Sequence, residues 1–174
     1  MYRHILIPTD GSELAEHAVT NGLALAKSVG ARVTVMIVLD PFDRLFVPET
    51  RAAQRQALEN LARHKEEVEK HAADVLDRAA DAARQAGVRC DTVQVENTRP
   101  YEAIIAAASD RGCDLIAMAS HGRGGLSAIV LGSVTNKVLT HTNPRLGVPL
   151  IQIAESGKHG AGCIQRARQS AGKK

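Results

Sequence analysis

Two short segments of this 174-residue chain carry residue types that could contact a small ligand, a phosphate above all. The first, Pro8-Thr9-Asp10-Gly11, places a hydroxyl and a carboxylate on a tight turn after an apolar run. The second has three glycines in the four positions 122–125 and ends in Gly132-Ser133-Val134-Thr135. Glycines let a backbone approach phosphate closely, and the amides at a following helix start favour an anion. Spacing alone leaves a second interpretation open, in which these glycines only turn the chain.

Neither common phosphate-binding fingerprint fits the glycine-rich segment. A dinucleotide GxGxxG beginning at Gly122 needs a glycine where the chain has Ser127. A Walker loop needs Gly-Lys-Ser/Thr, and the Gly-Lys pairs at Gly157 and Gly172 lie in the last 20 residues. Efficient phosphoryl transfer also requires groups that hold magnesium and position the nucleophile, and Asp10 is the only acid obviously near these segments. The pattern therefore favours binding over efficient catalysis, and no catalytic residue is assigned.

Short apolar runs alternate with helical patterns along the chain, which is typical of a parallel α/β fold. We expect strands at His4–Thr9, Arg32–Leu39, Val88–Glu96, Asp114–Ala119 and Val148–Ile153. We expect helices from Ser12 to Gly30, over roughly 49–86, over Pro100–Arg111, and from Ser127 or Gly132 to His141. Such a pattern predicts a doubly wound sheet with helices on both faces. Ligands of these sheets bind outside the carboxyl ends of the strands, where both segments lie.

Four passages of the sequence resemble the universal stress protein family, in its type with an ATP-binding motif. They are residues 5–12 (ILIPTDGS), 114–126 (DLIAMASHGRGGL), 132–139 (GSVTNKVL) and 149–153 (PLIQI). Their order and spacing are far more specific than any single glycine motif. The resemblance covers residues 1–154, which we expect to form the family domain, followed by a basic, glycine-rich and flexible tail at 155–174.

The resemblance implies a five-stranded parallel sheet in the order 3-2-1-4-5, with an adenine nucleotide alpha hydrolase-like fold. ATP-binding members carry Gly, two residues, Gly, nine residues, then Gly-Ser or Gly-Thr. Here Gly122 and Gly132-Ser133 match the second and third elements, whereas Ala119 replaces the first glycine. The methyl group of Ala119 would crowd a nucleotide, although a backbone contact would survive the replacement.

The implied function is a regulatory domain that binds ATP or a related adenine nucleotide, with Mg²⁺ possible beside ATP, and acts in stress response through dimer or partner contacts. The implied nucleotide-binding residues are Pro8, Thr9, Asp10, Val38, Ala119, His121, Gly122, Arg123, Gly132, Ser133, Val134 and Thr135. For three of them a structural role without ligand contact stays open: Asp10 as a helix cap, Val38 as a core residue and Arg123 as a solvated cation. Two other functions also stay open. One is a stress protein without nucleotide that acts by protein association, and the other is a slow ATPase or self-phosphorylating protein with Ser133 as acceptor.

Composition argues against several classes of protein. Aromatic residues make up 2%, with no Trp, which disfavours stacking on single-stranded nucleic acid. The net charge of +3 arises from the tail, because residues 155–174 carry +4 and the rest carries −1, so no nucleic-acid-binding surface is expected. No apolar run approaches the roughly 20 residues of a membrane span, and no secretory signal is visible. Three cysteines without a CxxC pair favour a reduced, cytoplasmic location.

Two further expectations concern a helix face and a sheet edge. His64, Glu67 and His71 share a helix, where a solvated face is favoured over a metal site. The last strand, Val148–Ile153, contains no charge, and nothing after it is expected to cover its edge. We therefore predict a homodimer in which two copies of this strand pair antiparallel. The alternative is a monomer whose edge is hidden by the 40–48 connection or by the tail.

Overall fold

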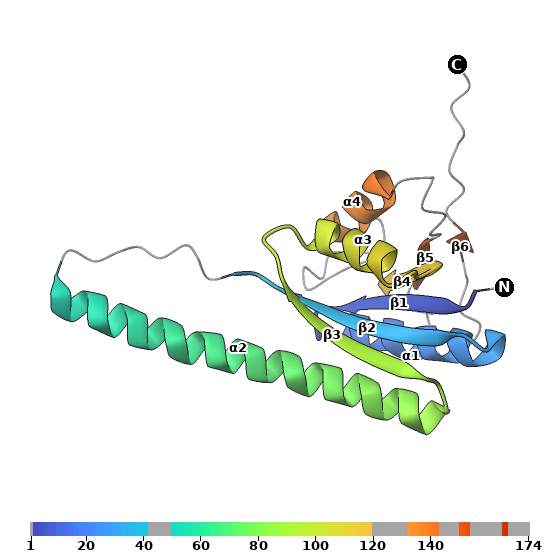
Figure 1. Ribbon diagram of the computed structural model, residues 1–174, viewed down its shortest axis with the longest axis horizontal. Coiled ribbons are helices and arrows are strands. Elements are labelled where there is room, and N and C mark those ends of the chain that lie inside the picture. Colours follow the sequence, from blue (N-terminus) through green and yellow to red (C-terminus); the bar gives the residue numbers. More distant parts are fainter. Residues whose placement is uncertain (1, 42–49, 120–131, 143–149, 154–164, 167–174) are drawn as a thin grey trace, which may run out of the picture.

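The computed structural model describes residues 2–41, 50–119, 132–142, 150–153 and 165–166 (Figure 1). In chain order the elements are β1 (His4–Thr9), α1 (Glu13–Val29), β2 (Arg32–Leu39), α2 (Arg51–Ala86), β3 (Cys90–Glu96), α3 (Pro100–Asp110), β4 (Leu115–Ala119), α4 (Ser133–His141), β5 (Leu150–Ile153) and β6 (Gln165–Arg166). The strands form one sheet in the order β3-β2-β1-β4-β5-β6. The predicted α/β class is confirmed, and β1 and β2 have the predicted bounds.

The prediction of a five-stranded, wholly parallel sheet is wrong at the β5 edge. A sixth strand, β6, comes from the tail and pairs antiparallel with β5, with Ile151 opposite Arg166 and Gln152 opposite Gln165. An open strand edge presents backbone donors and acceptors to any extended segment that reaches it, whatever the side chains of that segment are. The expectation that nothing after the last strand covers its edge is therefore wrong at these two positions. Val148 and Pro149, the predicted start of this strand, lie outside the described residues.

Helices cover both faces of the sheet, with α1 and α2 on one side and α3 and α4 on the other (Figure 1). Alternate residues of β1 point to opposite faces, as the pleat of a strand requires. Ile5 and Ile7 belong to the cluster under α1 and α2, whereas Leu6 belongs to the cluster under α3 and α4. All three side chains have 0% exposure, so β1 forms the centre of both core layers.

Local capping determines where the two longest helices begin and end. Ser12 accepts a hydrogen bond from the Ala15 amide at 3.3 Å, and Thr50 accepts one from the Ala53 amide at the same distance. Gly30 and Gly87 end α1 and α2 in the left-handed region, each at φ 71°, where a side chain would be strained. These polar and glycine signals follow the pattern by which helix ends satisfy their unpaired backbone groups.

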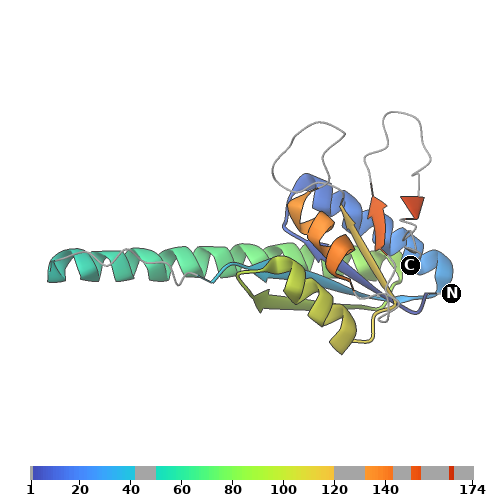
Figure 2. The same ribbon diagram turned by 90° about the horizontal axis from the view of Figure 1, so that it is seen from above.

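The helix α2 is much longer than the sheet that it covers. Its 36 residues span about 54 Å at 1.5 Å per residue, whereas an eight-residue strand spans about 26 Å. Its buried residues all lie in the second half, at Ala72, Val75, Leu76, Ala79 and Ala83. The first half therefore continues past the sheet as a rod, which Figure 2 shows from above.

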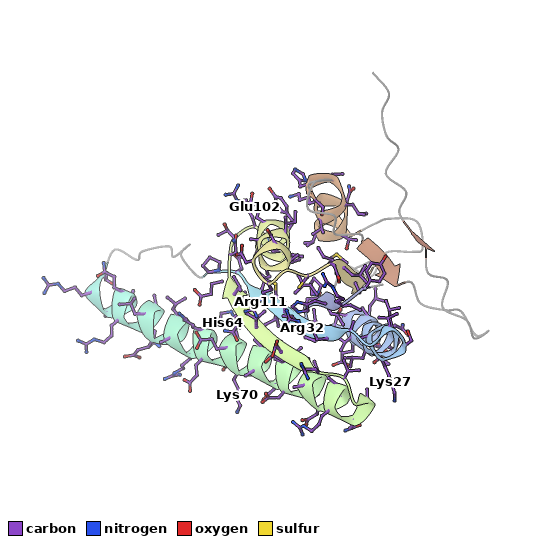
Figure 3. All side chains as sticks on the ribbon, turned by 45° about the vertical axis from the view of Figure 1, so that its right-hand side comes forward. Lys27, Arg32, His64, Lys70, Glu102 and Arg111 are labelled. Carbon is purple, nitrogen blue, oxygen red and sulfur yellow. The ribbon has the colours of Figure 1, made fainter. Side chains whose placement is uncertain are left out.

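His4 of β1 connects to β2 and to the end of α3 at the amino ends of the strands. Its imidazole Nε2 lies 2.8 Å from the Thr34 hydroxyl of β2, and Nδ1 lies 3.1 Å from the carbonyl oxygen of Arg111. Because a carbonyl can only accept, Nδ1 carries the proton and the neutral ring accepts from Thr34. Burial lowers the pKa of His4, and the nearby Arg32 guanidinium, labelled in Figure 3, lowers it further.

This lowered pKa predicts a loss of stability in mild acid. Below about pH 6.5 the unfolded chain binds a proton at His4 more readily than the folded chain does, so the stability that neutral His4 contributes decreases as pH falls through this range. We expect the urea midpoint of the wild type to fall between about pH 7.5 and about pH 5.5. His4→Gln keeps a donor and an acceptor but does not titrate, so it should lose less over the same interval. Equal losses in both proteins would assign the effect to other groups.

Candidate functional site

The pairing of β1 with β4 ends before either strand does. Its register pairs Ile5 with Leu115 and Leu6 with Ile116, whereas β1 pairs with β2 as far as Thr9 opposite Ile37. Pro8 has no N–H, so it can donate no ladder hydrogen bond near the carboxyl end of β1. The strand order also reverses between β1 and β4. In doubly wound sheets this is where ligands bind.

The turn after β1 is held by its own polar side chains. The Thr9 hydroxyl accepts from the Gly11 amide at 3.2 Å, and Asp10 Oδ1 accepts from the Ser12 amide at 3.0 Å. The Asp10 carboxylate therefore orders the turn that leads into α1, while Ser12 is the side-chain cap of the helix itself. Gly11 has φ 74°, a conformation that favours glycine.

Three of the expected residues meet at the carboxyl ends of neighbouring strands. Val38 follows the Ile37–Thr9 pair by one residue, which places it beside Asp10 in the register. Val38 is half-buried and packs against the cluster under α3 and α4, so it contributes to the core. Ala119 is the last residue of β4 and pairs with Ile153. The ends of β2, β1 and β4 thus lie side by side at this edge.

His71 of α2, which the sequence did not associate with this turn, also lies beside it. A Cβ atom built on Gly11 would lie 2.9 Å from Val75 Cγ2 and 3.3 Å from the His71 Nε2 nitrogen. The second half of α2 therefore closes over the β1–α1 turn, and a side chain at position 11 would displace it. His71 is 60 positions away along the chain, so neither periodicity nor a local motif could have associated it with Gly11.

The helix α4 begins at the predicted position without a side-chain cap. Gly132 precedes it with φ −51° and ψ 141°, and its carbonyl accepts from the Asn136 amide at 2.8 Å. The first amides of a helix, here those of Ser133 and Val134, point out of its amino end and are open to an acceptor from outside the helix. The Thr135 side chain is buried and Ser133 is exposed. Val138 packs in one cluster with Ile116 and Met118, which places α4 over β4.

The remaining expected site residues, His121, Gly122 and Arg123, lie outside the described residues. Within the described part of the chain, no group of three or more His, Cys, Asp or Glu residues could hold a metal ion. Burial raises the pKa of Cys113 to about 11, so its thiol is not poised as a nucleophile. Among the described helices, none combines the length and the apolar character that a membrane crossing requires.

Comparison with known proteins agrees with this architecture. The family model described as "Universal stress protein family" matches residues 1–144. The chain belongs to the universal stress protein family. The resemblance seen in the sequence is thereby confirmed. Universal stress protein MJ0577 of Methanocaldococcus jannaschii is 30% identical over 151 residues, which cover 82% of this chain and 91% of that relative.

Solved structures of universal stress proteins have the same fold. The structure of MJ0577 superimposes with a TM-score of 0.70 at 27% identity, covering 91% of this chain and 99% of that one. A universal stress protein in complex with cAMP gives 0.61 at 20% identity, over 89% and 98% of the two chains. One from Archaeoglobus fulgidus in complex with dAMP gives 0.56 at 19% identity, over 87% and 97%. At identities this low, the last two show the shared fold.

Proposed function

We propose that this universal stress protein binds an adenine nucleotide, ATP or a close relative, between the carboxyl ends of β1 and β4. We further propose that it acts in stress response through dimer or partner contacts. The observation that carries the first proposal is the early end of β1–β4 pairing at Leu6, followed by Asp10 on the β1 side. Relatives of the same fold in complex with cAMP and dAMP support an adenine ligand.

Each element at this edge has a distinct part in the proposed site. The amides of Gly132, Ser133 and Val134 and the hydroxyls of Ser133 and Thr135 face phosphate, because a helix start favours an anion. The carboxylate of Asp10 accepts from the ribose or the adenine, beside the apolar surface of Val38. The backbones of Pro8, Thr9 and Ala119 line the space between the strands, and His121, Gly122 and Arg123 complete the phosphate side. Mg²⁺ accompanies ATP as its counterion.

Two measurements test nucleotide binding directly. Mass spectrometry of the purified protein detects any adenine nucleotide that is retained. Titration calorimetry with ATP, AMP, cAMP and, as a control for the base, GTP gives the affinity for each. We expect saturable binding of an adenine nucleotide and weaker binding of GTP. A folded protein that binds none of them would instead be a family member that acts by protein association alone.

We also propose a homodimer through the outer edge of β5. The strand segment Leu150–Ile153 lacks charge, and its backbone edge beyond β4 is engaged at only two residues of β6 among those described. A second copy pairing there must displace β6, since both use the ladder groups at Ile151 and Gln152. The tail therefore competes with the dimer that we propose.

Ile151→Lys is expected to abolish this dimer, because lysine on an edge strand opposes strand pairing. In sedimentation at low micromolar concentration, the wild type should run near twice 18.6 kDa and Ile151→Lys near 18.6 kDa. Truncation after Ala154 removes β6 and should strengthen the dimer, and Ile151→Val serves as the conservative control. A wild type of monomer mass would contradict the proposal, and a dimer insensitive to Ile151→Lys would place the interface elsewhere.

A further inference from the structure

The first half of α2 leaves the body of the protein. The Lys65 ammonium lies 3.5 Å from the carboxylate of Glu96, the last residue of β3, and this contact marks where the sheet ends along the helix. The buried residues of α2 begin only at Ala72. Residues 51–64 thus stand beyond the sheet, over about 21 Å of helix (Figures 1 and 2).

One seam, apolar at every position except Lys65, runs through both halves of α2. It consists of Leu58, Leu61, Lys65, Val68, Ala72, Val75 and Ala79, spaced alternately by three and four residues. This is the spacing by which helices pack along a shared seam. The second half of the seam packs on the sheet and is buried, whereas Leu58 is 61% exposed, the one large hydrophobic side chain among the described residues that is so exposed. The seam therefore continues past the sheet that buries its other end.

Charge is segregated along the same helix. Residues 51–65 carry four cations and one anion, whereas residues 66–77 carry five anions and one cation. Figure 3 shows these side chains along the rod, with His64 and Lys70 labelled. Two such helices placed parallel would bring like charges together, whereas antiparallel helices would bring opposite charges together. We infer that the first half of α2 docks antiparallel on the same segment of a second copy.

The leucines and the charges agree on one alignment. In this alignment Leu58 lies beside Leu61 of the second copy. Arg51 then lies at nearly the same height along the helix axis as Glu69 of that copy, and Arg55 at nearly the same height as Glu66. The offset along the axis is about 3 Å or less for each pair. The four charged residues lie on one side of the seam, because they follow each other in steps of 4, 11 and 3 residues, close to whole turns. Glu69 is available for this contact, since its ion pair with Lys65 at 3.6 Å leaves both side chains about half exposed.

The contact involves only a short length of helix, so it should require a higher protein concentration than the β5 dimer does. It offers few apolar side chains per copy, which places it at the weak end of specific interfaces. To separate the two interfaces, the test uses the full chain with Ile151→Lys. In sedimentation from about 10 μM to about 500 μM, a range that brackets weak association, its mass should rise from 18.6 kDa toward twice that value.

Leu58→Glu in the same background should keep the protein monomeric over the whole range. Gln56→Glu introduces the same charge on the opposite side of the helix and should leave the association unchanged. Circular dichroism establishes that each variant is folded. A parent protein that stays monomeric overturns the proposal, as does an association that Leu58→Glu leaves intact. A monomeric parent whose melting temperature falls on Leu58→Glu would mean that the chain's own residues cover the seam.

A charge exchange tests the antiparallel alignment itself. Arg51→Glu should weaken the association severalfold, because it opposes Glu69 of the second copy with a like charge. Combining Arg51→Glu with Glu69→Arg restores the opposite pairing at both ends of the contact and should restore the affinity. Failure of the double variant to recover, with both single variants folded and weakened, would contradict this alignment.

Discussion

Replacing Gly22 by valine should lower the free energy of unfolding by about 2–3 kcal/mol, the upper part of the roughly 1–3 kcal/mol that overpacking a core costs. Gly22 lies in the middle of α1, on the buried face that packs against the sheet. A Cβ atom there would lie 2.5 Å from Cδ1 and 3.3 Å from Cγ1 of Ile7, and 3.9 Å from the Cβ of Ala117. Ile7 and Ala117 both have 0% exposure, so neither side chain has free space into which to move. The two methyl groups of valine would therefore push α1 off the sheet.

Thermal and urea unfolding measure this effect. A loss of this size should lower the melting temperature by roughly 4–12 °C for a domain of this length. Ala24→Val is the matched control, because it places the same side chain at an exposed position of the same helix. If Gly22→Val were as stable as Ala24→Val, Ile7 would have to repack at no cost, and the close approach of α1 would not restrict residue 22.

Gly132→Val should lower the affinity for adenine nucleotide at least tenfold, which corresponds to about 1.4 kcal/mol or more. In the proposed site Gly132 brings the start of α4 against the phosphates, and a branched side chain would occupy their position. The backbone of Gly132 is extended, at φ −51° and ψ 141°, which valine can adopt. The helix and the core should therefore stay intact while binding is lost.

Calorimetry with the tightest-binding adenine nucleotide compares Gly132→Val with the wild type. Thr140→Val is the control, since Thr140 is exposed near the other end of α4 and its substitution adds a β-branched apolar residue to the same helix. Thr140→Val should bind as the wild type does. Unchanged affinity in a folded Gly132→Val variant would mean that phosphate does not bind at the start of α4. That result would contradict the phosphate half of the proposed site.

The sequence alone determined the features that depend on near neighbours. The β-branched run of β2, the cap at Ser12 and the glycine stop at Gly30 act within a few residues, so β2 and α1 could be predicted closely. The α/β class followed from the alternation of such elements, and the family followed from four motifs in order. The candidate residues at the ends of β1, β2 and β4 could be named in advance because parallel strands bring their carboxyl ends to one edge.

Tertiary structure alone decided which distant segments meet. The sequence showed the long helical tract of α2, but only its packing put His71 over Gly11 and Lys65 beside Glu96, and only the extent of the sheet left residues 51–64 beyond it. The pairing of β6 with β5 likewise depends on a strand edge that is open in space, and nothing in the polar tail marks it as a strand. Periodicity and capping report contacts between residues within about four positions, whereas these contacts join residues from 13 to 60 positions apart, brought together by the layers of the fold.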